Sequence, residues 1–308
     1  MTIKETLLAN RPNLSAGSLR TYISILQNLA KQTGLALDTP DQVIENHKKV
    51  IEHLADVPSN VRKTRLSALV VFVEKAKGAD KVVEAFREQM LSDCKDYDKQ
   101  INKQEMTERQ KEGYIPLSDI MAKYHTLEKD AVALMKKDTL DKKEFARVQL
   151  YVILSCLLLI EPRRSLDYTE FKLKDIDESK DNFLKVEKRK PYFVFNQYKT
   201  AKKYGKQTQE IPAKLHKIIK RWSQLNPSEW LLVNTQQSNK ISPTQLTNML
   251  YSFFEKPIST SMLRHIFLTD KYKNVPALTD MMDTATHMGH DVSMALKYIK
   301  KVPSPEKN

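Results

Sequence analysis

The chain has 308 residues, 41% of them hydrophobic, which is enough for two domains with ordinary cores. Its formal charge of +13 attracts polyanions such as nucleic acid, although a basic protein that only stays soluble explains the charge equally well. Two cysteines exclude a disulfide framework and a cysteine zinc site. With neither a signal-peptide pattern nor a membrane-length apolar run, we expect a soluble intracellular protein, in the cytoplasm, the nucleoid or a host nucleus depending on its source.

The first third of the chain has the apolar spacing of amphipathic helices. Apolar residues recur every three or four positions over residues 18–34, 41–55 and 60–77, and a fourth such segment begins near Asp80. No segment in this region alternates convincingly as a strand. We therefore expect residues 1–94 to form a compact helical bundle.

Basic residues on this bundle are candidate contacts for DNA phosphates. Arg62 and Lys63 lie on the third predicted helix, and Arg20, Lys48 and Lys49 lie on its neighbours. For any one of them a solvated helix surface is the simpler interpretation, but together they favour DNA contact.

Residues 95–110 are polar throughout and indicate an interdomain linker, either an extended charged helix or a flexible strap. A second domain, residues 111–308, begins with a helical pattern from Leu117 to about Lys137. A strongly apolar helix from Asp141 to Ile160 follows, with Asp141 as its cap.

Short segments with strand alternation come next, at residues 182–188, 192–198 and 208–211. Further helical patterns lead to the end of the chain. The predicted fold class is therefore mainly helical with a small antiparallel sheet, an α+β protein.

Charged residues cluster where the apolar helix ends at Glu161-Pro162. Arg163 and Arg164 follow, with Asp167 three residues after Arg164. An arginine pair that caps a helix and pairs with Asp167 would be a purely structural explanation.

Lysines stand in and beside the predicted turn that follows residues 192–198. Lys199 ends the second predicted strand, and Lys202 and Lys203 lie in the turn beyond it, where they are candidate phosphate contacts. A solvated charge is the strong alternative for each.

The last fifty residues contain three more candidates. Arg264 lies on a predicted helix whose packed face is Leu263, Ile266 and Phe267, so a buried arginine there needs an anionic partner such as a phosphate. Met288-Gly289-His290 precedes a helical pattern with one tyrosine, Tyr298.

A metal site at His287 and His290 is disfavoured because no carboxylate or cysteine cluster accompanies them.

The order Arg164, Lys199, Arg264, His290 and Tyr298 resembles the active-site sequence of the tyrosine recombinases, the phage-type integrase family. The Glu-Pro-Arg-Arg and Asp-Tyr context is most similar to integrases of viruses and mobile elements. The resemblance implies a helical DNA-binding domain ahead of a catalytic domain.

By this resemblance, Tyr298 attacks a DNA phosphodiester and forms a 3′-phosphotyrosyl link. Arg164 and Arg264 hold the phosphate, Lys199 protonates the departing 5′ oxygen, and His290 orients the phosphate or moves protons. No metal, cofactor, ATP or small-molecule substrate is required. The expected partner is double-stranded DNA, on which the protein assembles as a homotetramer.

Two departures from the family pattern leave alternatives open. Ser261 occupies the position that usually holds histidine or lysine, and the spacing from His290 to Tyr298 is one residue shorter than the commonest one. A catalytically impaired DNA-binding relative is therefore one alternative.

A type IB topoisomerase is another, although its smaller viral forms begin with a strand-rich domain. Arg163 also remains possible as the first catalytic arginine, although Asp167 is one place too far from it.

Overall fold

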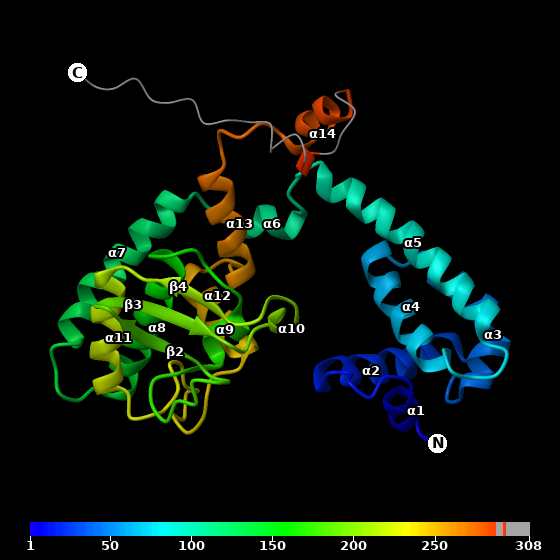
Figure 1. The fold of residues 1–308 in the computed structure, drawn as a ribbon, viewed down its shortest axis with the longest axis horizontal. Coiled ribbons are helices and arrows are strands. Elements are labelled where there is room, and N and C mark those ends of the chain that lie inside the picture. Colours follow the sequence, from blue (N-terminus) through cyan, green and yellow to red (C-terminus); the bar gives the residue numbers. More distant parts are fainter. Residues whose placement is uncertain (288–291, 294–308) are drawn as a thin grey trace. The chain divides into compact units, whose positions relative to one another are not determined.

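The computed structural model describes residues 1–287 and 292–293, which form two compact units (Figure 1). The first comprises residues 1–105 together with the described residues from Pro276 on, and the second comprises Met106–Val275. Each unit has a hydrophobic core of its own. No helix in the described part of the chain has the length and apolar character needed to cross a bilayer.

In its described residues the first unit has helices and loops but no strand. The predicted helices are confirmed. Helix α5 continues to Asn102, so the first half of the predicted linker, residues 95–102, is helical. The additional helix α1 has only eight residues, and a capping box of Thr2 and Glu5 begins it. The helices of this unit are α1 (Ile3–Asn10), α2 (Ala16–Thr33), α3 (Pro40–Leu54), α4 (Ser59–Val73), α5 (Asp80–Asn102) and α14 (Leu278–His287).

Helix α4 is the centre of this unit because it contacts α1, α2, α3 and α5. Its second half, from Leu66 to Val73, is almost entirely buried. Helix α14 meets the end of α5, where the Leu278 amide donates to Gln104 Oε1 at 2.8 Å. The core of this unit therefore lies around the second half of α4, where burial of apolar side chains stabilises the fold through the hydrophobic effect.

The second unit is built around α8, whose residues from Val148 to Leu157 are nearly all buried. Asp141 caps α8 by accepting from the Lys143 and Glu144 amides. The helices of this unit are α6 (Glu108–Gly113), α7 (Leu117–Leu134), α8 (Lys142–Leu158), α9 (Ser165–Thr169), α10 (Ala201–Tyr204), α11 (Ala213–Leu225), α12 (Pro243–Phe254) and α13 (Thr260–Lys271).

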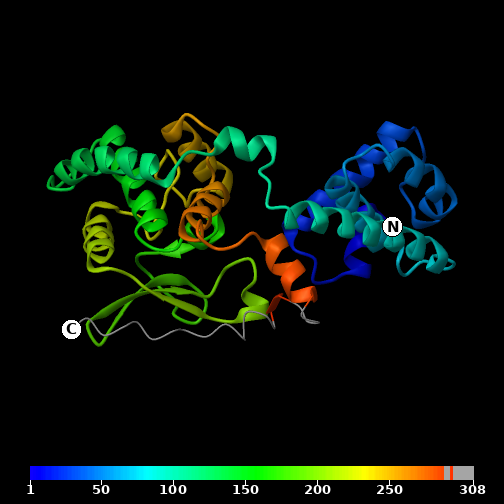
Figure 2. The same ribbon diagram turned by 90° about the horizontal axis from the view of Figure 1, so that it is seen from above.

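A four-stranded sheet in the order β1-β2-β3-β4 covers one side of the helices of this unit (Figure 2). Strands β2, β3 and β4 pair antiparallel, as predicted from their alternation. The predicted small sheet also contains β1, which no pattern predicted; β1 pairs parallel to β2, so the whole sheet is mixed. Two residues are too few to show an alternating pattern. The strands are β1 (Phe171–Lys172), β2 (Asn182–Glu187), β3 (Lys190–Phe195) and β4 (Gln207–Glu210).

Candidate nucleic-acid site

The two adjacent arginines after α8 have different environments. Arg163 donates from Nε to Asp167 Oδ2 at 2.7 Å, and its guanidinium carbon lies 4.0 Å from the centroid of the Phe195 ring. Arg164 is exposed at the N-cap of α9, and its side chain has no hydrogen bond or ion pair with any described residue. The purely structural explanation therefore applies to Arg163, whereas Arg164 is available to a ligand.

Asp167, which anchors Arg163, is only 2% exposed. Burial raises the pKa of its carboxyl group, and the charge of Arg163 opposes that effect. Its second oxygen, Oδ1, is buried and has no hydrogen-bond partner in the described part of the chain. The Asp167 carboxylate thus supports Arg163 from inside the unit.

Arg264 projects from α13, whose residues Met262, Leu263 and Ile266 are buried. Phe267, predicted to be packed with them, is only partly buried. Arg264 is also partly buried, and its side chain has no hydrogen bond or ion pair with another described residue.

Burial lowers the pKa of the Arg264 guanidinium, and the nearby positive charge of Arg164 lowers it further, although the Asp167 carboxylate partly opposes these effects. A partly buried cation beside another cation is unfavourable until an anion arrives. Arg264 and Arg164 therefore form a site suited to an anion such as phosphate.

A hydrogen bond between two hydroxyl groups joins the elements that carry these arginines. Ser165 Oγ in α9 and Thr260 Oγ1 in α13 lie 2.7 Å apart, and Thr260 is 2% exposed. No local sequence pattern could reveal this contact, because the two positions are 95 apart in the chain. It fixes the helix after Arg164 against the first turn of the helix that bears Arg264.

Lys199 lies in the connection between β3 and β4, residues 196–206, since β3 ends at Phe195 and not at the predicted residue 198. The side chain is exposed and has no hydrogen bond or ion pair with the other described residues. The next-door Tyr198 is buried, and its hydroxyl donates to Gly205 O at 2.6 Å.

Lys202 and Lys203 are exposed on the short helix α10 in the same connection. They were predicted to lie in a turn, and that turn is a single helical one. Both side chains are therefore on the surface, a few positions after Lys199 in the sequence.

Glu161 joins three elements at the border of this site, and sequence reasoning did not select it. It accepts from Lys271 Nζ of α13 and from Gln209 Nε2 of β4, each at 3.2 Å. A hydrogen bond from its own backbone amide lowers the pKa of Glu161, and the bond from Lys271 lowers it further. Its partners are distant in the sequence, so no local pattern could reveal them.

Ser261 is exposed in the first turn of α13, three residues before Arg264. His290 and Tyr298 lie outside the described residues. The structure therefore does not test the pair of His287 and His290 as a metal site. The structure thus brings Arg163, Arg164 and Arg264 together. Among the residues that it describes, it shows no cluster of His, Cys, Asp or Glu that could hold a metal.

Arg62, a predicted phosphate contact in the first unit, is partly buried, and its guanidinium is bound by other groups of the same unit. Its Nη2 lies 2.6 Å from Oδ1 of Asp93, which is 1% exposed, and its Nη1 donates to Ala55 O at 2.6 Å. The prediction for Arg62 therefore needs correction, because its guanidinium joins α4 to α5 and to the end of α3. Lys63 is only partly buried, and a hydrogen bond to the Cys94 thiol raises the pKa of Lys63.

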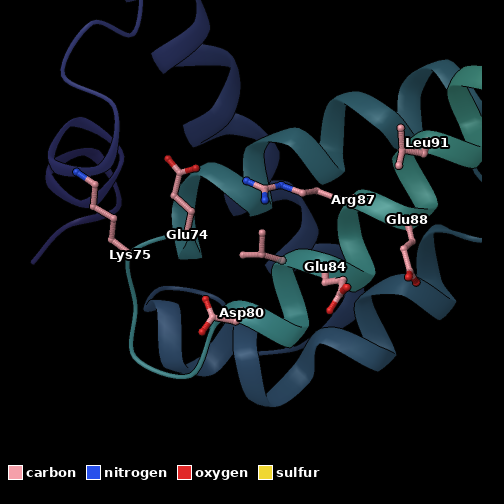
Figure 3. Close-up of a pocket in the computed structure, with 8 residues that line it drawn as sticks. Glu74, Lys75, Asp80, Glu84, Arg87, Glu88 and Leu91 are labelled. Atoms are coloured by element: carbon pink, nitrogen blue, oxygen red, sulfur yellow. The ribbon is translucent and has the colours of Figure 1, made fainter.

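A surface pocket of the first unit has the wrong charge for DNA (Figure 3). Acidic side chains of Asp80, Glu84 and Glu88 line it along α5, beside Arg87 and Glu74. Their negative charge repels phosphate, so we exclude this pocket from the nucleic-acid site.

No protein-family model matches the chain, and no curated protein sequence matches it significantly.

Proposed function

We propose that the chain is a site-specific DNA recombinase, or integrase, of the tyrosine type. The observation that carries the proposal is the pair Arg164 and Arg264, which lie close enough for their charges to interact, while neither side chain forms an ion pair with a described residue. The Ser165–Thr260 bond fixes the helices that carry them. Two guanidinium groups in this arrangement suit the nonbridging oxygens of one phosphate.

The proposed reaction exchanges one ester for another. Tyr298 Oη bonds to phosphorus, the bond between phosphorus and the 5′ oxygen breaks, and the phenol proton leaves during the attack. Because free tyrosine has a pKa of about 10, the positive field of the site assists this loss. Arg164 and Arg264 offset the charge that builds on the phosphate in the transition state.

The departing 5′ oxygen is a poor leaving group unless it receives a proton. Lys199 is the proposed general acid for that proton, and His290 the proposed group that orients the phosphate. The 3′-phosphotyrosyl product keeps the energy of the ester, so no ATP is consumed. Attack on it by a 5′ hydroxyl from another duplex gives recombination, and attack by the original hydroxyl restores the strand.

The direct test is capture of the covalent intermediate. A target-site duplex nicked next to the scissile phosphate loses a short fragment with a 5′ hydroxyl, so the adduct accumulates and resists SDS. We expect Tyr298→Phe to abolish the adduct while DNA binding persists. The matched control is Tyr272→Phe, an exposed tyrosine after α13, which should form the adduct normally.

An adduct of unchanged yield in Tyr298→Phe would refute the assignment of the nucleophile. Specific DNA binding without any adduct would instead favour the alternative of a catalytically impaired relative.

Assembly on DNA separates a recombinase from a type IB topoisomerase. Exchange between duplexes needs four protomers on two sites, whereas relaxation needs one protomer on one duplex. We expect a monomer in free solution and a higher-order complex on paired sites, measured by light scattering. A fully active single protomer per duplex that relaxes supercoiled plasmid would make the protein a topoisomerase.

A further inference from the structure

The buried amide of Asn182 binds the connection that carries Lys199. Asn182 begins β2 and is 0% exposed. Its Oδ1 accepts from the amides of Asn196 at 2.8 Å and Gln197 at 2.7 Å, and its Nδ2 donates to Gln197 O at 2.7 Å. One side chain thus fixes the backbone two residues before Lys199.

The same amide also reaches residues 161–167, the segment that carries Arg163 and Arg164 and that we call the arginine loop. Nδ2 of Asn182 donates to the backbone oxygen of Asp167 at 3.0 Å, which brings its hydrogen bonds to four. An amide side chain has two donor hydrogens and two acceptor lone pairs, so Asn182 is fully satisfied. A buried polar group in this state specifies one arrangement of the chains that it joins.

Arg163 makes a second connection between the same two segments. Its guanidinium carbon lies 4.0 Å from the Phe195 ring centroid and 5.2 Å from that of Tyr198, the residue immediately before Lys199. Its Nε is bonded to the Asp167 carboxylate, so Asp167 anchors both connections. Stacking of a desolvated guanidinium on aromatic rings adds attraction that a neutral side chain lacks.

We propose that Asn182 and Arg163 are positioning residues for Lys199. Together with Asp167 they form what we call the clamp, which holds residues 196–198 against the arginine loop. This inference rests on the proposed function, because it gives a role to a general acid.

Lysine has a long flexible side chain, so its amine is aligned with the phosphate only if its backbone is held. Neither Asn182 nor Arg163 touches the substrate in this proposal.

Backbone amide exchange tests the clamp without any catalysis. We expect Arg163→Met and Asn182→Asp to increase hydrogen–deuterium exchange in residues 196–206 by about tenfold or more, while the core of α8 stays protected. Asn182→Asp keeps the shape but removes both donors. The matched control is Arg164→Met, which changes the adjacent arginine and should leave the exchange of residues 196–206 as in the wild type.

If Asn182→Asp does not fold, Arg163→Met alone decides, because Arg163 is only partly buried. Unchanged exchange in residues 196–206 of the folded variants would overturn the proposal, whether or not the protein cleaves DNA.

A change of leaving group tests whether the clamp acts through Lys199. In a substrate with sulfur in place of the bridging 5′ oxygen, the leaving thiolate needs no protonation, so loss of a general acid is tolerated. We compare the cleavage rate of the oxygen substrate with that of the sulfur substrate. We expect Lys199→Ala, Arg163→Met and Asn182→Asp to lower this ratio of rates by about tenfold or more. Arg164→Ala should slow cleavage of both substrates equally.

Equal slowing of both substrates in Arg163→Met and Asn182→Asp would show that they act on phosphate binding or on folding, and would overturn the proposal. A wild-type protein that cleaves neither substrate would refute the proposed function, and with it a catalytic role for Lys199. The exchange rates would still show whether the clamp holds residues 196–206.

Discussion

Ser165 and Thr260 share a hydrogen bond of 2.7 Å that ties the arginine loop to the helix bearing Arg264. Thr260→Val keeps the shape of the side chain but leaves Ser165 Oγ without this partner. We expect the free energy of unfolding to fall by about 1 kcal/mol, because the partly buried Ser165 hydroxyl loses its hydrogen bond. Urea unfolding measures that change, and single-turnover cleavage should slow in parallel.

The control is a double-mutant cycle with Ser165→Ala. If the bond matters, the second substitution has little further effect once the first is present. Additive effects of the two substitutions would contradict the coupling.

Arg264 should destabilise the free protein. Its pKa is lowered by burial and by Arg164, which means that folding disfavours the charged guanidinium. We therefore expect Arg264→Met to raise the free energy of unfolding slightly, because solvent screens the exposed part of the guanidinium, while cleavage falls. Thermal unfolding in sodium chloride is the measurement.

Sulfate provides the matching test of anion binding. Sulfate stabilises most proteins by exclusion, so the comparison is between variants at equal ionic strength. The wild type should gain more stability from sulfate than Arg264→Met does. An equal gain, or a loss of stability in chloride for Arg264→Met, would contradict an anion site at these arginines.

Arg62 and Lys63 are neighbours with opposite expected effects. Arg62→Ala leaves the buried Asp93 carboxylate without its partner, and we expect a loss of about 3–5 kcal/mol in the free energy of unfolding. Lys63→Ala should barely change stability but should lower the salt slope of DNA binding by about one.

Chemical denaturation and binding titrations at several salt concentrations measure the two effects. A stable Arg62→Ala protein with a reduced salt slope would return Arg62 to the set of phosphate contacts.

The hairpin between β2 and β3 has a strained basic tip. Lys188 and Arg189 form its two-residue connection with φ values of 49° and 67°. Asn and Gly adopt such positive φ values more easily than lysine or arginine. Replacing both, as Lys188→Asn with Arg189→Gly, should raise the free energy of unfolding by about 1–3 kcal/mol.

DNA affinity is the second measurement on this variant. If the strain is retained for phosphate contact, the stabilised protein binds DNA more weakly. A variant that is no more stable than the wild type would show that the turn is relaxed.

Local chemistry explains how much of the fold could be predicted. Helix α2 begins and ends within two residues of its predicted limits, because Ser15 caps its start and Gly34 adopts a left-handed φ at its end. The last predicted residues of α4 are not helical, since Val73 ends the helix and a turn leads to Gly78. The spacing of apolar residues thus predicted which segments are helical, whereas the capping residues determine where each helix begins and ends.

The site required contacts that span the chain. Arg163 and Arg164 are the same residue type side by side, and only the Phe195 ring and Asp167 distinguish their roles. Asn182 resembles any polar residue at the start of a strand until its partners near residue 197 are known. The roles assigned to Lys199, His290 and Tyr298 stay predictions.

Gly205 shows where distant relatives of this chain could be recognised. Its φ of 64° and ψ of −160° fall in a region that is essentially closed to residues with a Cβ, and its oxygen accepts the Tyr198 hydroxyl. Lys202 and Lys203 could vary without changing this backbone path, whereas any side chain at position 205 would require another path. A homologue that keeps glycine there, even where the lysines differ, would be expected to keep the same connection.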